Sequence, residues 1–209
     1  MGEDQNFPKV KINFFIIILS FIFISNSYSE KIVLEKLVEL VSPWGSSFIN
    51  NNEIIVTEKS GKIKIVDILS KEIQEVSHEL NFVVHGQGGL LDIVYKDNIV
   101  WISYTEDRGN YKTSTSIARA EFNKKKLNFK NIFQANPPID SGYHFGSRLA
   151  IKGDYIYASA GERGQGMIAQ DGSKHPGSII RIHLNGEIPK DNPKFEGNPD
   201  WLPEIYQIG

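Results

Sequence analysis

The feature that most limits the possible folds is a succession of short β-type runs that restarts three times along the chain. The runs are rich in Ile, Val and Tyr and are separated by Gly, Asn, Asp and Lys, which is the pattern of strands joined by turns. Comparable second runs begin at Glu53, Ile99 and Tyr155, about 46 and 56 residues apart. The third runs Ser116–Phe122 and Ser178–Leu184 share the pattern S-I-x-R.

A repeat of about 50 residues, made of three or four short strands, is typical of β-propeller blades. An irregular β-sandwich is the alternative, because its strands also recur but need not recur as a unit. We therefore predict an all-β fold, a β-propeller, with about three blades in residues 30–209. A blade buries its faces only against neighbouring blades, and a closed ring needs at least about four of them. The repeat thus predicts that this chain is a truncated part of a longer propeller.

Residues 1–29 have the features of a secretory signal peptide. A basic start precedes the apolar stretch Ile12–Ile24, which at 13 residues is shorter than a membrane-spanning helix requires. Small residues at Ser27 and Ser29 predict cleavage before Glu30. We expect an exported protein, periplasmic or secreted, with no stable membrane association after cleavage. An uncleaved membrane anchor is the alternative.

Charge and cysteine content exclude several functional classes. The chain has 23 basic and 25 acidic side chains, which gives no reason to expect nucleic acid as a partner. The basic run Lys124–Lys126 is interpreted as a solvated turn between strands. The absence of cysteine removes thiol catalysis and thiolate metal sites. Glycine-rich stretches at 85–92 and 161–166 precede no helical pattern, which argues against nicotinamide or ATP binding.

The candidate functional residues lie just before the first strands of the repeat, which line the central channel in a propeller. The leading segments His85–Gly89 and Tyr143–Gly146 each carry a hydrogen-bonding side chain beside glycines, Gln87 and His144 respectively. We expect these two side chains to meet at one mouth of the channel. Neutral imidazole accepts a proton near neutral pH, so His144 is a candidate general base. A structural histidine hydrogen-bonded in a turn is the alternative. The other histidines are weaker candidates: His78, His85, His175 and His183.

Several motifs resemble the glucose/sorbosone dehydrogenase family. They are GQGGLLD (86–92), YHFGSRL (143–149), GER-G (161–164), GEIPKDNP (186–193) and PEIYQIG (203–209). The likeness runs in register from about Ser42 to Gly209 and is closest to the bacterial soluble aldose sugar dehydrogenases. Members of that group are six-bladed β-propellers that use pyrroloquinoline quinone (PQQ) together with Ca²⁺.

The resemblance implies an oxidoreductase that converts the anomeric C1 hydroxyl of an aldose to the lactone, with hydride transfer to PQQ and an external electron acceptor. It puts His144 at the position of the base that takes the hydroxyl proton, Gln87 beside the quinone, and Glu162 at an acidic position near the sugar. Ca²⁺ would polarise the quinone carbonyl. The family's Arg-Asn-Pro segment and its calcium ligands are expected beyond residue 209, so the resemblance implies that this chain alone is inactive.

Two other functions stay open at this stage. One is a non-catalytic β-propeller that binds a sugar or a protein partner, because a fold does not fix a function. The other is a calcium-dependent hydrolase of the lactonase type. It is disfavoured because the leading segments lack the cluster of carboxylates and amides that such enzymes need.

Overall fold

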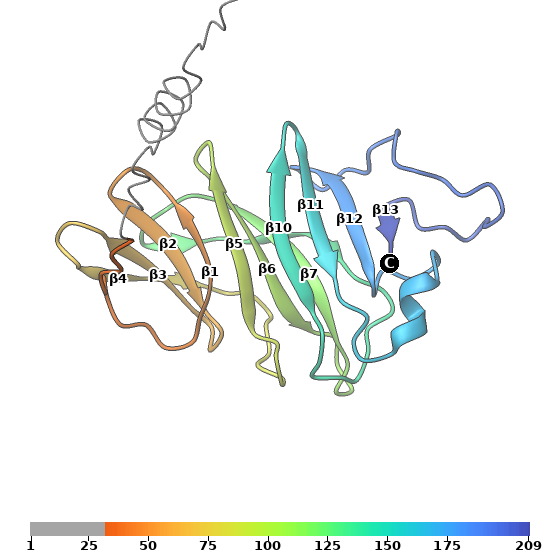
Figure 1. The fold of residues 1–209 in the computed structure, drawn as a ribbon, viewed down its shortest axis with the longest axis horizontal. Coiled ribbons are helices and arrows are strands. Elements are labelled where there is room, and N and C mark those ends of the chain that lie inside the picture. The colour runs from red at the N-terminus through yellow and green to blue at the C-terminus, as the bar shows by residue number, and fades with distance from the viewer. Residues whose placement is uncertain (1–31) are drawn as a thin grey trace, which may run out of the picture. The chain divides into compact units, whose positions relative to one another are not determined.

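Three β-sheets follow one another along the chain in the computed structural model, which describes residues 32–209 (Figure 1). Sheet 1 contains β1 (Pro43–Phe48), β2 (Glu53–Glu58), β3 (Lys62–Asp67) and β4 (Ile73–His78), with the short β8 (Lys126–Leu127) paired parallel to β4. Sheet 2 contains β5 (Leu90–Lys96), β6 (Ile99–Asp107), β7 (Thr113–Glu121) and β9 (Lys130–Gln134). Sheet 3 contains β10 (Gly146–Lys152), β11 (Tyr155–Ala160), β12 (Ser178–His183) and β13 (Ile205–Ile208). A single 3₁₀ turn, η1 (Gly166–Gln170), connects β11 to β12.

Each sheet contains four strands that pair antiparallel in chain order, which is the arrangement of propeller blades. The predicted all-β propeller with about three blades is therefore confirmed. Two predicted runs, Glu53–Glu58 and Tyr155–Ala160, coincide with β2 and β11. The sequence pattern did not separate β4, which pairs with the short β8, or β9, which forms the outer edge of its sheet.

The three sheets are held together by two apolar cores, one on each face of sheet 2. Successive side chains of a strand point to opposite faces, and in β6 the side chains on both faces are buried. Ile102 packs with Ile55 and Ile63 of sheet 1 in one core. Trp101 packs with Ile156 and other residues of sheet 3 in the other core. Sheet 2 thus lies between its two neighbours as a middle blade does.

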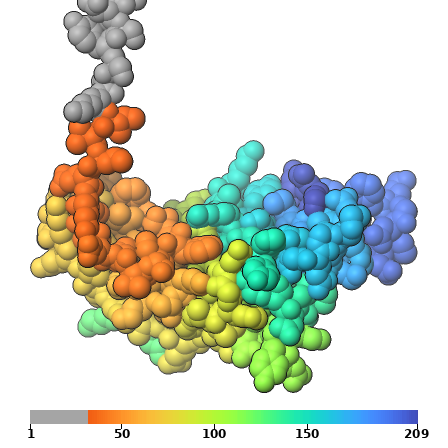
Figure 2. Space-filling view, turned by 60° about the horizontal axis from the view of Figure 1, so that its bottom comes forward, coloured from red at the N-terminus to blue at the C-terminus, as the bar shows by residue number. Residues whose placement is uncertain are grey.

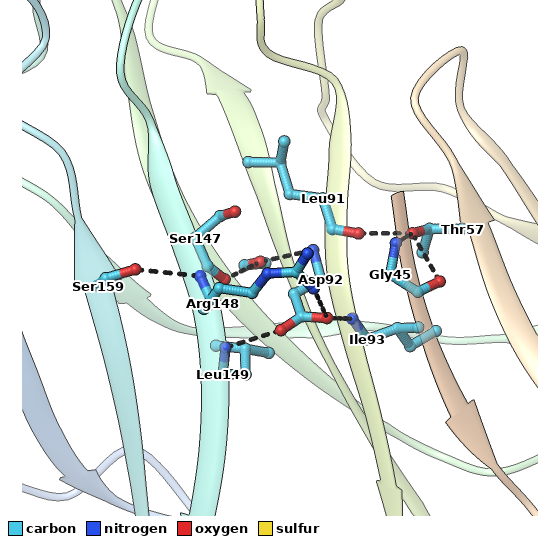
Figure 3. A network of polar contacts seen from close by, with 10 residues as sticks. Gly45, Thr57, Leu91, Asp92, Ile93, Ser147, Arg148, Leu149 and Ser159 are labelled. Atoms are coloured by element: carbon cyan, nitrogen blue, oxygen red, sulfur yellow. Dashed lines mark hydrogen bonds and ion pairs between the residues drawn. The ribbon is translucent and has the colours of Figure 1, made fainter. Parts of the chain in front are cut away.

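Polar contacts join the inner strands of the three sheets (Figure 3). The Thr57 hydroxyl donates to the Leu91 carbonyl, which links β2 to β5. The buried carboxylate of Asp92 accepts from the Leu149 amide at 2.9 Å, which links β5 to β10. Opposite Asp92 stands Gly45, where a Cβ atom would lie only 2.7 Å from the Asp92 Cα. These contacts of Thr57, Asp92 and Gly45 keep β1, β5 and β10 side by side. The segments that lead into the three strands therefore lie at the same end of the sheets.

The structure bears on the N-terminal segment and on the basic run predicted from the sequence. The predicted signal peptide, residues 1–29, lies outside the described residues, as does most of the segment before residue 37, where the unit containing the sheets begins. Within residues 32–209 no helix is long and apolar enough to cross a membrane. The basic run is solvated, since Lys124 and Lys126 form exposed ion pairs with Glu53 and Glu79.

Candidate active site

The structure brings His144, Gln87 and Glu162 into one hydrogen-bonded cluster. Gln87 lies in the segment before β5, His144 lies in the segment before β10, and Glu162 follows β11. The yellow segment that leads into β5 and the green-to-teal segment that leads into β10 lie side by side on the face shown in Figure 2. The two leading segments that the repeat singled out therefore meet in space, 57 residues apart in sequence.

Gln87 fixes the backbone at His144. Its side-chain Oε1 accepts from the His144 backbone amide at 2.8 Å, and the Gln87 backbone N–H donates to the Gly142 carbonyl at 2.7 Å. With Oε1 used in this way, the Nε2 amide group is the part of Gln87 that is left to donate to a ligand.

His144 adopts a backbone conformation that is unusual for a residue other than glycine. Its φ is +50°, in the left-handed region. Such conformations persist only where the surroundings impose them, and they concentrate at functional sites. The bond from Gln87 provides part of that constraint. Gly161 provides more, because a Cβ atom there would lie 1.9 Å from the His144 carbonyl oxygen. The imidazole itself is 51% exposed and can therefore meet a ligand.

Glu162 orients the imidazole. One of its carboxylate oxygens is paired with Nδ1 of His144 and also accepts from the Gly164 amide at 3.1 Å. The hydrogen bond with His144 lowers the pKa of Glu162, so the carboxylate is ionised at neutral pH. An ionised carboxylate at Nδ1 favours the tautomer that carries its proton there, which leaves the Nε2 lone pair free. The resemblance assigned Glu162 to sugar binding. Its immediate contact is with His144 instead, and contact with a sugar stays a prediction.

Arg163 anchors the segment that carries His144, a role that the sequence analysis missed. Its buried guanidinium donates to the Tyr143 carbonyl at 2.9 Å, to the Thr113 carbonyl at 3.0 Å and to the Ser141 carbonyl. It also lies 3.7 Å from the centre of the Phe145 ring. Burial lowers the pKa of Arg163 to about 10, which leaves the side chain charged at neutral pH.

Two cationic side chains have contacts to β5 or to the segment that leads into it. Lys59 donates through Nζ to the carbonyl of Gly86, the neighbour of Gln87. Arg148 lies on β10 with its side chain 69% exposed and 3.3 Å from the Asp92 carboxylate. The described residues contain no group of three or more histidine or acidic side chains that could hold a metal ion.

Two of the other four histidines, His78 and His175, have structural surroundings. Nε2 of His78 lies 2.8 Å from the Gly61 carbonyl, and the His175 ring is buried against Phe133. His144 is thus the histidine that combines exposure, an oriented ring and a strained backbone.

Comparison with known proteins gives a family match over most of the described chain. The family model described as Glucose / Sorbosone dehydrogenase matches residues 40–209. The chain belongs to the glucose/sorbosone dehydrogenase family.

Several similar proteins are named as sugar dehydrogenases. The chain is similar to the aldose sugar dehydrogenase YliI of Escherichia coli, with 31% identity over 82% of this chain and 48% of that protein. It is similar to the quinoprotein glucose dehydrogenase B of Acinetobacter calcoaceticus, with 26% identity over 88% of this chain and 45% of that protein. The PQQ-bound aldose sugar dehydrogenase of Streptomyces coelicolor superposes with a TM-score of 0.69 and 27% identity, over 80% of this chain and 52% of that one. The chain thus spans about half the length of the relatives it matches.

Proposed function

We propose that the full-length protein is a quinone-dependent dehydrogenase that oxidises the anomeric C1 hydroxyl of aldoses to the lactone, with His144 as general base. The observation that carries the proposal is the His144–Glu162 pair, set beside Gln87 at the meeting point of two leading segments. Membership of a family of sugar-oxidising quinoproteins supports the same chemistry.

His144 is suited to take the hydroxyl proton. Its Nδ1 is paired with the Glu162 carboxylate, so Nε2 is the nitrogen left to accept a proton from the sugar. The imidazolium that forms would remain beside an ionised carboxylate, which stabilises the positive charge. Because the hydrogen bond of Gln87 is made to the backbone of His144, the base would keep its position while it changes charge.

Gln87 would help to hold both substrate and cofactor. Its Nε2 can donate to a sugar hydroxyl or to a carbonyl oxygen of the quinone. The backbone bond through Oε1 fixes the orientation of this amide. Glu162 would act through His144, and its second carboxylate oxygen is a candidate contact for a sugar hydroxyl.

The residues present fit a quinone that carries carboxylates. A tricarboxylate such as PQQ needs positive charge. Lys59 lies at the Gly86 carbonyl beside Gln87, and Arg148 lies on β10 four residues after His144, where it is paired with Asp92. We propose that these two side chains, with Gln87, hold PQQ in the full-length protein. When bound, PQQ would accept the hydride from C1. We also propose Ca²⁺ as a cofactor, with ligands beyond residue 209, on the basis of the family resemblance alone.

The remaining parts of the proposal concern partners and location. Electrons would leave to an external acceptor, and nucleic acid is not expected as a partner because the chain has a net charge of only −2. We propose a periplasmic or secreted protein, because residues 12–24 have the length and composition of a signal-peptide core.

The test is PQQ-dependent dye reduction by the full-length protein with glucose and Ca²⁺, together with a direct titration of PQQ by fluorescence quenching. Dye reduction that requires both PQQ and the sugar supports the proposal. Sugar binding without PQQ binding would support the non-catalytic alternative instead.

A further inference from the structure

A pocket of about 420 Å³ lies at the end of sheet 2 where the chain leaves β7 and returns as β9. All of its lining comes from residues 119–130, and the polar members are Arg119, Glu121, Asn123, Lys126, Asn128 and Lys130. We call it the β7–β9 pocket. Arg119 lies six residues along β7 from Thr113, which Arg163 contacts. At about 3.4 Å per residue, the pocket is therefore about 20 Å along the strand from the candidate active site.

Two cations stand directly opposite each other in this pocket. Arg119 of β7 pairs with Lys130 of β9 in the antiparallel register, so the two side chains project from the same face of the sheet. Like charges at paired positions destabilise neighbouring strands. Within residues 32–209 neither cation has an ion-pair partner, whereas Lys124 and Lys126 are each paired with a glutamate. An anion held between Arg119 and Lys130 would remove their repulsion.

The Arg119 side chain also contains an unsatisfied donor. Its Nε–H group is buried and has no hydrogen-bond acceptor in the part of the chain that the structure describes. A buried donor without a partner costs folding free energy, and the cost is larger for a charged group. Such a group in a native protein calls for an explanation, and a bound ion is one of them. An anion would supply the acceptor and neutralise the charge at the same time.

Amide side chains add neutral donors to the same pocket. Asn123 accepts through Oδ1 from the backbone amides of Lys125 and Lys126, at 2.8 and 3.3 Å. These two bonds orient the side chain and leave its Nδ2 group to donate. Asn128 brings a second amide group. A guanidinium, an ammonium and amide N–H groups together are suited to bind the several oxygen atoms of a small oxyanion.

One carboxylate in the lining narrows the class of anion. Glu121 stands two residues after Arg119 on β7, so its side chain leaves the same face of the strand. A carboxylate repels an anion that has no proton, such as sulfate or a phosphodiester. It accepts a hydrogen bond from an anion that keeps one. Inorganic phosphate keeps a proton at neutral pH, whereas a phosphate monoester, with a second pKa of about 6, has mostly lost its last one.

From these observations we propose that the β7–β9 pocket binds inorganic phosphate, with Arg119 and Lys130 as its charged ligands and Glu121 accepting a hydrogen bond from the P–OH group. The site is independent of the proposed dehydrogenase function, because none of its residues belongs to the candidate active site. Bound phosphate neutralises the repulsion between β7 and β9 and so stabilises sheet 2.

Calorimetric titration of the full-length protein with sodium phosphate, and with sodium sulfate at the same ionic strength, measures binding directly. Phosphate should bind wild type about tenfold more tightly than sulfate, and Arg119→Gln and Lys130→Gln should each weaken phosphate binding about tenfold or more. The Lys130 side chain is exposed, so its variant keeps the test valid if Arg119→Gln does not fold. The matched control Lys125→Gln removes a charge from the adjacent basic run outside the pocket lining and should bind phosphate as wild type does.

Thermal unfolding gives a second readout. Added phosphate should raise the melting temperature of wild type and Lys125→Gln more than that of Arg119→Gln or Lys130→Gln. The proposal is overturned if wild type shows no saturable phosphate binding in the millimolar range. Equal affinity for phosphate and sulfate, or an equal loss of affinity in Lys125→Gln, would also overturn it, because either result indicates general screening of positive charge. Binding to phosphatidylglycerol vesicles without binding of free phosphate would assign the pocket to a lipid headgroup instead.

Discussion

Replacing Arg163 by methionine tests whether the buried guanidinium holds the candidate base in place. Methionine keeps a long side chain against Phe145 but removes every hydrogen bond to the segment of residues 141–145 and to Thr113. The Tyr143 and Ser141 carbonyls would lose their charged donor. A hydrogen bond to a charged group contributes about 1.5–3 kcal/mol. Part of this loss is offset because methionine carries no charge that must be buried. We expect the free energy of unfolding to fall by about 2–4 kcal/mol.

The same substitution should lower turnover more than it lowers binding. Displacement of a catalytic group by about 1 Å can cost roughly 10²-fold in rate. In the full-length protein we therefore expect kcat to fall about 10²-fold in Arg163→Met, with the dissociation constant of PQQ changed less than about threefold. Stability is measured by urea denaturation, kcat by dye reduction with glucose, and PQQ binding by fluorescence quenching.

Arg108→Met is the matched control. Arg108 is a partly buried arginine of the β6–β7 turn that bonds to Ser114 at 3.0 Å and makes no bond to the segment of residues 141–145. It should lose some stability and keep its kcat. Arg163→Lys, which keeps the charge, should fall between Arg163→Met and wild type in kcat. A folded Arg163→Met protein with wild-type kcat would refute the anchoring role.

Further predictions concern the Glu162 carboxylate, stability in acid and the Asp92 contacts between sheets. Glu162→Gln removes the charge that orients His144, and kcat should fall about 10- to 10²-fold while PQQ titration is unchanged. The hydrogen bond with His175 lowers the pKa of Glu204, so the stability that this carboxylate contributes is present above its unfolded pKa and is lost as pH falls through the lower folded value. Between about pH 6 and pH 3 the urea midpoint should therefore fall less in Glu204→Gln than in wild type. Asp92→Ala leaves the buried Leu149 and Ile93 amides without their acceptor and should cost about 2–3 kcal/mol of unfolding free energy by urea denaturation.

The fold could be predicted from the sequence because the blade repeat is visible in the order of strands. Strands such as β2 and β11 are apolar enough to stand out from their turns, and the restart of the pattern gives the blade boundaries. The outer strands β4 and β9 were harder to recognise, since each buries only one of its side chains and is otherwise polar. A mostly exposed strand of this kind carries little apolar periodicity.

The site was partly predictable for the same reason. Equivalent positions in two blades had to meet at one end, which brought Gln87 and His144 together by topology alone. The contacts that orient the site were not predictable in this way. The Glu162–His144 pair spans 18 residues and the Arg163–Thr113 bonds span 50, and neither leaves a pattern in the sequence. The left-handed backbone at His144 is likewise imposed by tertiary neighbours such as Gly161.

The measurement that tests the account most directly is the rate of PQQ-dependent glucose oxidation by full-length wild type and His144→Ala, each saturated with PQQ and Ca²⁺. If His144 is the base, kcat should fall by about 10² or more in the variant, while its PQQ titration stays close to that of wild type. A variant that binds PQQ normally and turns over at the wild-type rate would contradict the assignment of His144 and, with it, the proposed mechanism.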